Sequence, residues 1–143
     1  MTLPADLIVL GLGVRPATEL ALAAGLPLGE DGGVLTDRRM RVPGRDGLWA
    51  GGDCVEVLHR VSQRRVYVPL GTHANKHGRV IGTNLGGGYA TFPGVVGTAV
   101  TKVCDLEVAR TGLLEAEAWR AGFEPVSGTV RSTTRAPSRS PSR

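Results

Sequence analysis

The sequence predicts an α/β protein in which helices cover a sheet buried on both faces. Two short apolar runs each stop at glycine-rich turns, residues 5–10 at positions 11–13 and residues 48–50 at positions 51–52. Continuous apolar runs of this length, bounded by turn residues, are typical of buried strands. Aromatic residues make up only 4% of the chain, so we expect Val, Leu, Ile and Ala to form the core.

Between these two runs, the sequence predicts one helix and little other regular structure. Residues 17–24 are rich in Ala, Leu and Glu, and Gly25 and Pro27 stand where a helix would end. Residues 26–46 contain many glycines and prolines around a short extended piece at residues 34–36. We expect a crossing segment there.

The middle of the chain predicts a hairpin or loop excursion followed by the longest helix. Residues 55–68 hold two β-branched stretches around a polar turn. In residues 70–85, apolar or small residues recur at helical spacing from Ala74 to Leu85, with Pro69 before them and three glycines after them.

The segment after the glycines predicts two strands and a short helix, in residues 97–103, 106–111 and 114–121. This order differs from the preceding α/β pattern, so we expect a new domain to begin near Pro93. From residue 127 onward the composition is almost wholly Ser, Thr, Arg, Pro, Gly and Ala. Such a segment cannot bury enough apolar surface to offset chain entropy, and the sequence predicts a disordered tail.

The net charge of +4 comes entirely from this tail. Residues 131–143 hold four arginines and no acid, so residues 1–130 carry thirteen basic and thirteen acidic side chains. The body of the protein therefore has no basic bias, and we expect no nucleic-acid partner. Binding of RNA through the arginine- and serine-rich tail is the alternative.

Other patterns argue against membrane, disulfide and metal sites. No run approaches the ~18 apolar residues that span a bilayer, and the amino terminus does not resemble a signal peptide, so we expect a cytoplasmic protein and no membrane partner. Cys54 and Cys104 are far apart and predict buried, inert thiols. His73 and His77 have metal-ligand spacing, but no third ligand accompanies them, and we expect no metal.

The strongest local signal is the glycine pair followed by an acid, in residues 48–53, which read LWAGGD. A carboxylate at the carboxyl end of a strand can accept hydrogen bonds from sugar-type hydroxyls, and Gly51 and Gly52 would let a cofactor approach the main chain. Alternatively, Asp53 only begins a turn or caps a helix.

Four stretches resemble, in order, the FAD-dependent pyridine nucleotide-disulfide oxidoreductases. Residues 11–20 (GLGVRPATEL) resemble the end of that family's NAD(P)H-binding domain, and residues 48–54 (LWAGGDC) resemble its second FAD motif. Residues 68–79 (VPLGTHANKHGR) resemble the helix that follows, and residues 92–113 resemble the entry to the dimerisation domain. The resemblance covers most of residues 5–124 and is strongest to the coenzyme A-disulfide reductase and NADH oxidase branch.

The resemblance implies a partial FAD/NAD(P)-binding Rossmann-like domain followed by the start of an α+β dimerisation domain. It assigns residues 1–16 to the end of the NAD(P)H-binding domain and residues 17–91 to the carboxy-terminal part of the FAD-binding domain. Residues 92–126 would be a truncated dimerisation domain, and residues 127–143 the tail. Proteins of this family form homodimers.

The resemblance also implies FAD as a cofactor, with NAD(P)H as the reductant in the complete family protein. The Asp53 carboxylate would hold a ribityl hydroxyl of FAD, with Gly51 and Gly52 clearing the space. Main-chain amides at the start of the following helix would stabilise negative charge on the pyrimidine edge of the reduced flavin. The residues predicted there are Leu70, Gly71, Thr72 and His73. A helix start without a ligand is the alternative.

Two features of the family do not occur in this sequence: the G-x-G-x-x-G turn of the first FAD motif, and the redox-active cysteine. We therefore expect no catalytic residue in this chain and no activity from it alone. The parent reaction would pass electrons from NAD(P)H through FAD to a disulfide, persulfide or oxygen. The alternative is a non-catalytic nucleotide-binding chain, or one that pairs with a separate amino-terminal chain. The resemblance stops after Pro125, and we interpret the tail as a frameshifted or misannotated end.

Overall fold

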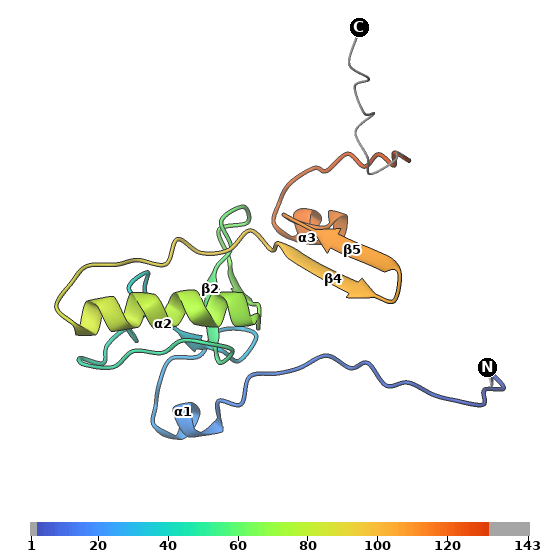
Figure 1. Cartoon of the computed structure of the whole chain (residues 1–143). Helices are drawn as coiled ribbons and strands as arrows, with labels where there is room; N and C mark the ends of the chain where they lie inside the picture. Colours follow the sequence, from blue (N-terminus) through green and yellow to red (C-terminus); the bar gives the residue numbers. More distant parts are fainter. Residues whose placement is uncertain (1–2, 132–143) are drawn as a thin grey trace, which may run out of the picture. The chain divides into compact units, whose positions relative to one another are not determined.

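The computed structural model describes residues 3–131 and divides into two compact units, with the boundary between Gly112 and Leu113. The first unit contains α1 (Glu19–Ala23), β1 (Val34–Leu35), β2 (Val55–Leu58), β3 (Arg65–Tyr67), α2 (Gly71–Leu85), β4 (Ala99–Val103) and β5 (Leu106–Arg110) (Figure 1). The second unit contains α3 (Glu115–Arg120). The mixture of helices and strands confirms the predicted α/β class.

A three-stranded mixed sheet lies at the centre of the first unit, in the order β1-β2-β3. β2 pairs in parallel with β1 and antiparallel with β3, so the hairpin predicted in residues 55–68 is confirmed. Val55 and Val57 of β2 face the core, while Glu56 between them is buried on the opposite face. The central strand is therefore covered on both sides, as a short apolar strand requires.

The core joins this sheet to α2 and to the crossing segment that follows β1. It consists of eight buried side chains, namely Val34, Met40, Val42, Val55, Val57, Val80, Phe92 and Val95. α2 contributes Val80 directly, and His77 and Asn84 are buried on the same face of the helix. The helical spacing in residues 70–85 thus predicted this helix, but not the face by which it packs. Of the predicted stripe, Gly78 and Leu85 are exposed, and Ala74 and Ile81 are half-buried.

β4 and β5 form a separate two-stranded antiparallel ribbon whose register runs from Ala99↔Arg110 to Val103↔Leu106. Both strands agree with the predicted extended runs, and α3 agrees with the predicted short helix. Cys104 lies at the turn of the ribbon with φ of +52° and is exposed. The prediction of a buried Cys104 thiol is wrong, because a two-residue turn between exposed strands offers nothing to cover it.

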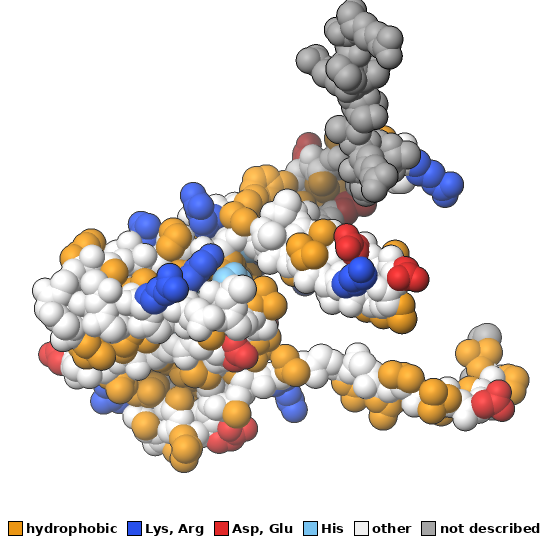
Figure 2. Space-filling model, viewed as in Figure 1, with side chains coloured by type: hydrophobic (Ala, Val, Ile, Leu, Met, Phe, Trp, Pro, Cys, Tyr) orange, Lys and Arg blue, Asp and Glu red, His pale blue; other side chains and the backbone are white. Residues whose placement is uncertain are grey.

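Residues 5–10 were predicted to form a buried strand, and that prediction is wrong. These residues belong to no helix or strand, and Leu7, Ile8 and Leu10 are 81%, 76% and 77% exposed. Figure 2 shows their hydrophobic side chains along the extended segment that leads from the N-terminus. A strand needs a neighbour for its N–H and C=O groups, and no residue between 3 and 131 pairs with this segment.

The second predicted strand, residues 48–50, is reduced to a single bridge between Trp49 and Arg41. The amide of Ala50 also donates to the carbonyl of Met40 at 3.1 Å, and the carbonyl of Leu48 accepts from the amide of Val42 at 2.9 Å. A single bridge does not make a strand, so no strand ends at Asp53. It lies in the turn that immediately precedes β2. The tail beyond residue 131 lies outside the described residues.

Candidate cofactor-binding site

The glycine turn that carries Asp53 packs closely against α2, and it can do so because Gly51 has no side chain. A Cβ atom placed on Gly51 would lie 2.9 Å from Cδ1 of Ile81 and 3.0 Å from Cβ of His77. Real Cβ atoms are essentially never that close to other carbon atoms, so a larger residue would force the turn and α2 apart. Gly51 therefore sets the distance between the turn and the helix.

Gly52 and Asp53 form the open tip of the same turn. Gly52 has φ of +85°, which favours glycine, and a Cβ there would meet no atom within 4 Å. Asp53 is exposed. A ligand can therefore approach both the main chain at Gly52 and the carboxylate of Asp53.

His77, on α2, holds the main chain of this tip in place. It is only 2% exposed, and its Nδ1 accepts a hydrogen bond of 3.2 Å from the amide of Gly52. Its ring packs edge-on against Phe92, with 4.4 Å between centroids and an interplanar angle of 89°. Since Nδ1 acts as an acceptor, the ring is neutral and its proton is on Nε2.

The environment of His77 favours this neutral form strongly. Burial lowers the pKa of His77 to about 4, a positive charge on His73 adds to the lowering, and the carboxylate of Asp53 opposes it. The Nε2 atom is buried and has no partner among residues 3–131. In the sequence, His77 drew attention only because it lies four residues after His73, a spacing that can bind a metal. The sequence signal for its burial was its position three residues before Val80 and seven before Asn84, which puts all three on one face of a helix.

The start of α2, the helix that also carries His77, presents free amides. No side chain caps this helix, and Leu70 precedes it in an extended conformation. The carbonyl of Leu70 accepts from the amides of His73 at 2.8 Å and Ala74 at 3.1 Å. Of the amides predicted to face a ligand, that of His73 is thus already bonded, whereas those of Gly71 and Thr72 have no hydrogen-bond partner in the described part of the chain.

The charge of Asp53 acts on a residue of β3 as well as on α2. The pKa of Tyr67 is raised mainly by desolvation and further by the nearby carboxylate of Asp53. The Cys54 thiol is half-buried, and its Sγ donates to the carbonyl of Gly51 at 3.5 Å. The bonded thiol helps to shape the glycine turn, and its predicted inertness stays a prediction.

Glu56 is a buried carboxylate that the sequence did not reveal as structurally important. It is 0% exposed, and its Oε1 accepts from the amides of Asp31 at 2.9 Å and Gly33 at 3.0 Å. Its Oε2 is buried with no hydrogen-bond partner among the described residues. Gly29 and Gly33 leave room for it, because a Cβ at either position would collide with Glu56. The carboxylate therefore fastens the glycine-rich turn at residues 29–33 to the central strand.

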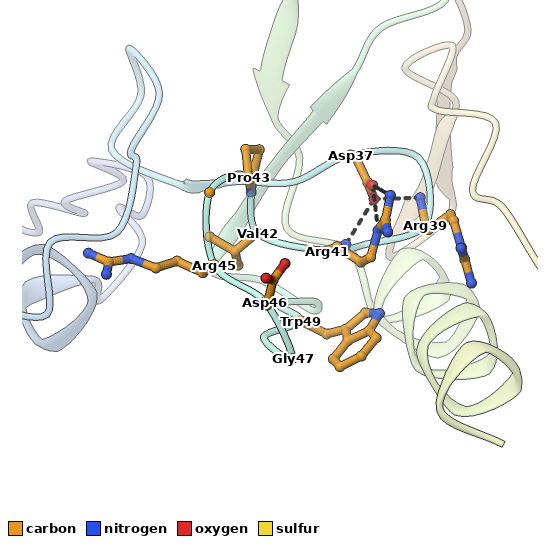
Figure 3. Close-up of a pocket in the computed structure, with 10 residues that line it drawn as sticks. Asp37, Arg39, Arg41, Val42, Pro43, Arg45, Asp46, Gly47 and Trp49 are labelled. Carbon is orange, nitrogen blue, oxygen red and sulfur yellow. Dashed lines mark hydrogen bonds and ion pairs between the residues drawn. The ribbon is translucent and has the colours of Figure 1, made fainter. Parts of the chain in front are cut away.

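A cavity of about 390 Å³ lies beside the crossing segment, between residues 37 and 49, and three arginines line it (Figure 3). Each of these arginines already has a partner. Arg41 forms an ion pair of 2.8 Å with Asp37. Burial raises the pKa of Asp37, but hydrogen bonds from Arg41 and from the amide of Arg39 outweigh burial and lower that pKa below its usual value. Arg45 donates to two backbone carbonyls, and Arg39 donates to Asn84. These contacts brace the segment.

Within residues 3–131, no group of three His, Cys, Asp or Glu side chains is arranged to hold a metal ion. His73 and His77 stack with 6.5 Å between ring centroids. Among the same residues, no helix is long and apolar enough to cross a membrane.

Comparison with known proteins places this chain in a family. Residues 1–78 match the family model described as pyridine nucleotide-disulphide oxidoreductase. The chain is 40% identical over 131 residues to an NAD(P)H coenzyme A polysulfide/persulfide reductase of Pyrococcus horikoshii, covering 92% of this chain and 29% of that protein. It is 35% identical over 132 residues to an NADH oxidase of Methanocaldococcus jannaschii, again covering 92% and 29%.

A solved structure has a similar fold. The crystal structure of an FAD-dependent pyridine nucleotide-disulphide oxidoreductase from Desulfovibrio vulgaris matches with a TM-score of 0.76 and 45% identity, covering 87% of this chain and 31% of that one. The chain belongs to the pyridine nucleotide-disulphide oxidoreductase family. The resemblance to its coenzyme A-disulfide reductase and NADH oxidase branch, and the similarity to an FAD/NAD(P)-binding domain, are confirmed. The chain spans 29% of the length of the curated relatives it matches.

Proposed function

We propose that residues 48–78 supply one wall of an FAD site, with the carboxylate of Asp53 bonded to a hydroxyl of the ribityl chain. The observation that carries this proposal is the exposed carboxylate on a turn whose geometry is fixed at both glycines. Gly51 allows contact with α2, and the amide of Gly52 is bonded to the buried His77. A preorganised acceptor of this kind loses little conformational freedom when it binds a hydroxyl.

The start of α2 would add a second contact to the same cofactor. The unbonded amides of Gly71 and Thr72 carry the partial positive charge of the helix start, and that charge favours an anion. Toward a bound flavin, these amides would stabilise negative charge on the pyrimidine edge after reduction. Leu70 and His73 would shape this end of the helix, through the hydrogen bond between them.

The complete protein would pass electrons from NAD(P)H through FAD to a disulfide, persulfide or oxygen. Hydride transfer requires the nicotinamide and the flavin to be stacked with reacting atoms about 3–3.5 Å apart. The printed sequence contains neither a G-x-G-x-x-G pyrophosphate turn nor a C-x-x-C pair. This chain would therefore hold part of the flavin and require further polypeptide for turnover.

A second candidate function, pairing with a separate polypeptide, is favoured by the apolar segment near the amino terminus. Leu7, Ile8 and Leu10 are exposed, although runs of this composition normally form buried strands. The ribbon of β4 and β5 also exposes Val100, Leu106 and Val108. We assign the first surface to a strand-pairing partner that completes the nucleotide-binding domain, and the second to a homodimer contact.

Two measurements test these functions. A titration of the purified chain with FAD, followed by flavin fluorescence, should show saturable binding by the remaining wall of the site. Co-expression with the amino-terminal polypeptide of a family member should give a yellow complex with NADH-dependent turnover. A colourless complex that forms but retains no flavin would contradict the FAD site, whereas failure of any complex to form would contradict the pairing function alone.

A further inference from the structure

A second cavity, of about 260 Å³, lies beside the first half of α2 and carries cations without partners. The residues that give it its chemistry are Arg60, His73, Lys76, Phe92 and Thr98. Among the described residues, no acidic side chain lines it. Within residues 3–131, neither the guanidinium of Arg60 nor the ammonium of Lys76 forms an ion pair or a side-chain hydrogen bond.

This arrangement differs from the arginine-lined cavity at residues 37–49. There, Arg41 is neutralised by Asp37, and Arg45 is bonded to backbone carbonyls. Arg60 and Lys76 line one cavity to which the described part of the chain contributes no acidic side chain, so the electrostatic potential there favours an anion. The unmatched charge therefore points to a ligand that brings negative charge.

The walls of this cavity are fixed by main-chain contacts. The amide of Arg60 donates to the carbonyl of Val95 at 2.7 Å, and the amide of Val95 donates to the carbonyl of Leu58 at 2.9 Å. Gly94 has φ of +93°, and a Cβ at that position would collide with the same Leu58 carbonyl. Lys76 stands on the 15-residue α2. Arg60 is therefore attached to backbone that two main-chain hydrogen bonds hold, and Lys76 to a regular helix.

The cavity also has apolar lining residues, among them Phe92, which is 5% exposed, and Val95. The hydroxyl of Thr98, which also lines the cavity, is already bonded to that of Thr111 at 2.7 Å. The volume of about 260 Å³ is several times the ~30 Å³ that one water molecule occupies in the liquid. A phosphate group between the cations leaves space for a small apolar group against Phe92.

We propose that this cavity binds a phosphate monoester, whose phosphate lies between Arg60 and Lys76 and whose organic group contacts Phe92. Arginine and lysine both bind phosphate through charge-assisted hydrogen bonds, and arginine can do so with two parallel bonds. The site shares His73 with the proposed flavin contact at the start of α2, but it makes no use of Asp53, and binding of the monoester does not require FAD.

The test uses phenyl phosphate as the probe and amide chemical shifts of the full chain as the readout, at constant ionic strength. Residues 92–98 should shift saturably, and inorganic phosphate should bind about tenfold more weakly because it makes no contact with Phe92. Arg60→Gln and Lys76→Gln should each weaken phenyl phosphate binding by about tenfold, which corresponds to ~1.4 kcal/mol. Both residues are exposed, so the variants should keep the amide spectrum of the folded chain.

Arg79→Gln is the matched control, because Arg79 is an exposed cation of α2 that does not line the cavity. It should change the affinity by less than twofold. An equal loss of affinity in the Arg79 variant would show a general charge effect and overturn the site. Binding of phenyl phosphate that leaves residues 92–98 unshifted, or no saturable binding at all, would also overturn it.

Discussion

Two apolar regions of this chain have opposite fates. Residues 34–95 close around a core in which Val34, Met40 and Val57 are 3%, 1% and 4% exposed. Residues 7–12 are at least as apolar in sequence, yet Leu12 is 88% exposed. The difference shows that an apolar run specifies a strand only when the strands and helices that cover it are also present. The first region contains its own partners, and the second does not find any among the described residues.

The largest effect expected from this comparison is on the free energy of unfolding. Met40→Ala removes a fully buried side chain and should cost about 2–5 kcal/mol, because it leaves a cavity between the crossing segment and the sheet. Leu12→Ala should change the stability by less than about 0.5 kcal/mol. The shift in the midpoint of urea unfolding measures both. Equal effects would contradict the contrast between the two regions.

The pH dependence of stability sharpens the description of the core at His77. Its pKa is about 4 in the folded chain and 6.5 in the reference state, so the unfolded chain binds more protons between these values. Stability should be complete above pH 6.5 and should fall by up to about 3 kcal/mol as the pH decreases toward 4.

The control for this effect is His77→Gln, which keeps a side-chain acceptor for the amide of Gly52 but has no titrating group. Its unfolding free energy should change by less than half as much over the same pH range. A wild-type protein whose stability is flat between pH 4 and 6.5 would contradict the buried, neutral imidazole.

A smaller loss is expected for Glu56→Ala, of about 1–3 kcal/mol. The substitution leaves the buried amides of Asp31 and Gly33 without their acceptor. Glu30→Ala is a matched control, since Glu30 is an exposed neighbour with the same side chain. Thermal unfolding of the two variants compares them directly. An equal midpoint for both would show that Glu56 does not fasten the turn at residues 29–33.

The smallest effect on the isolated chain is expected where the apolar surface is uncovered. We expect the simultaneous replacement of Leu7, Ile8 and Leu10 by Ser to change the free energy of unfolding of the isolated chain by no more than about 0.5 kcal/mol for each residue replaced. The same change should weaken association with a completing amino-terminal polypeptide by more than tenfold, because each buried Leu or Ile contributes about 1.5–3 kcal/mol. Pull-down at graded concentrations measures the association, and unchanged binding would contradict the strand-pairing surface.

The sequence predicted those elements whose determinants are local. α2, the hairpin of β2 and β3, and the ribbon of β4 and β5 all follow from spacing and turn residues within a short window. The pattern failed at residues 5–10 because a strand depends on distant partners. It also failed at residues 48–50, because one bridge to Arg41 replaced the expected ladder. The predicted domain boundaries stay predictions.

The sequence predicted the residues of the glycine turn in the candidate site, but not the buried residues that hold them in place. Asp53, Gly51 and Gly52 were indicated by an acid after two glycines. The contribution of His77 depends on a contact with Gly52 that spans 25 positions, and that of Glu56 on a contact with Gly33 that spans 23. Separations of this size leave no periodic signal in the sequence, so only the folded arrangement reveals them.

The central claim is that the Asp53 carboxylate bonds to the sugar-alcohol chain of FAD, and the FAD affinity of the Asp53→Ala variant tests it most directly. Asp46→Ala, which removes an exposed carboxylate from another turn, is the control. Fluorescence titration should show about tenfold to hundredfold weaker binding for Asp53→Ala, the loss expected for a hydrogen bond to a charged group, and no change for Asp46→Ala. Equal affinities in the two variants would contradict the account.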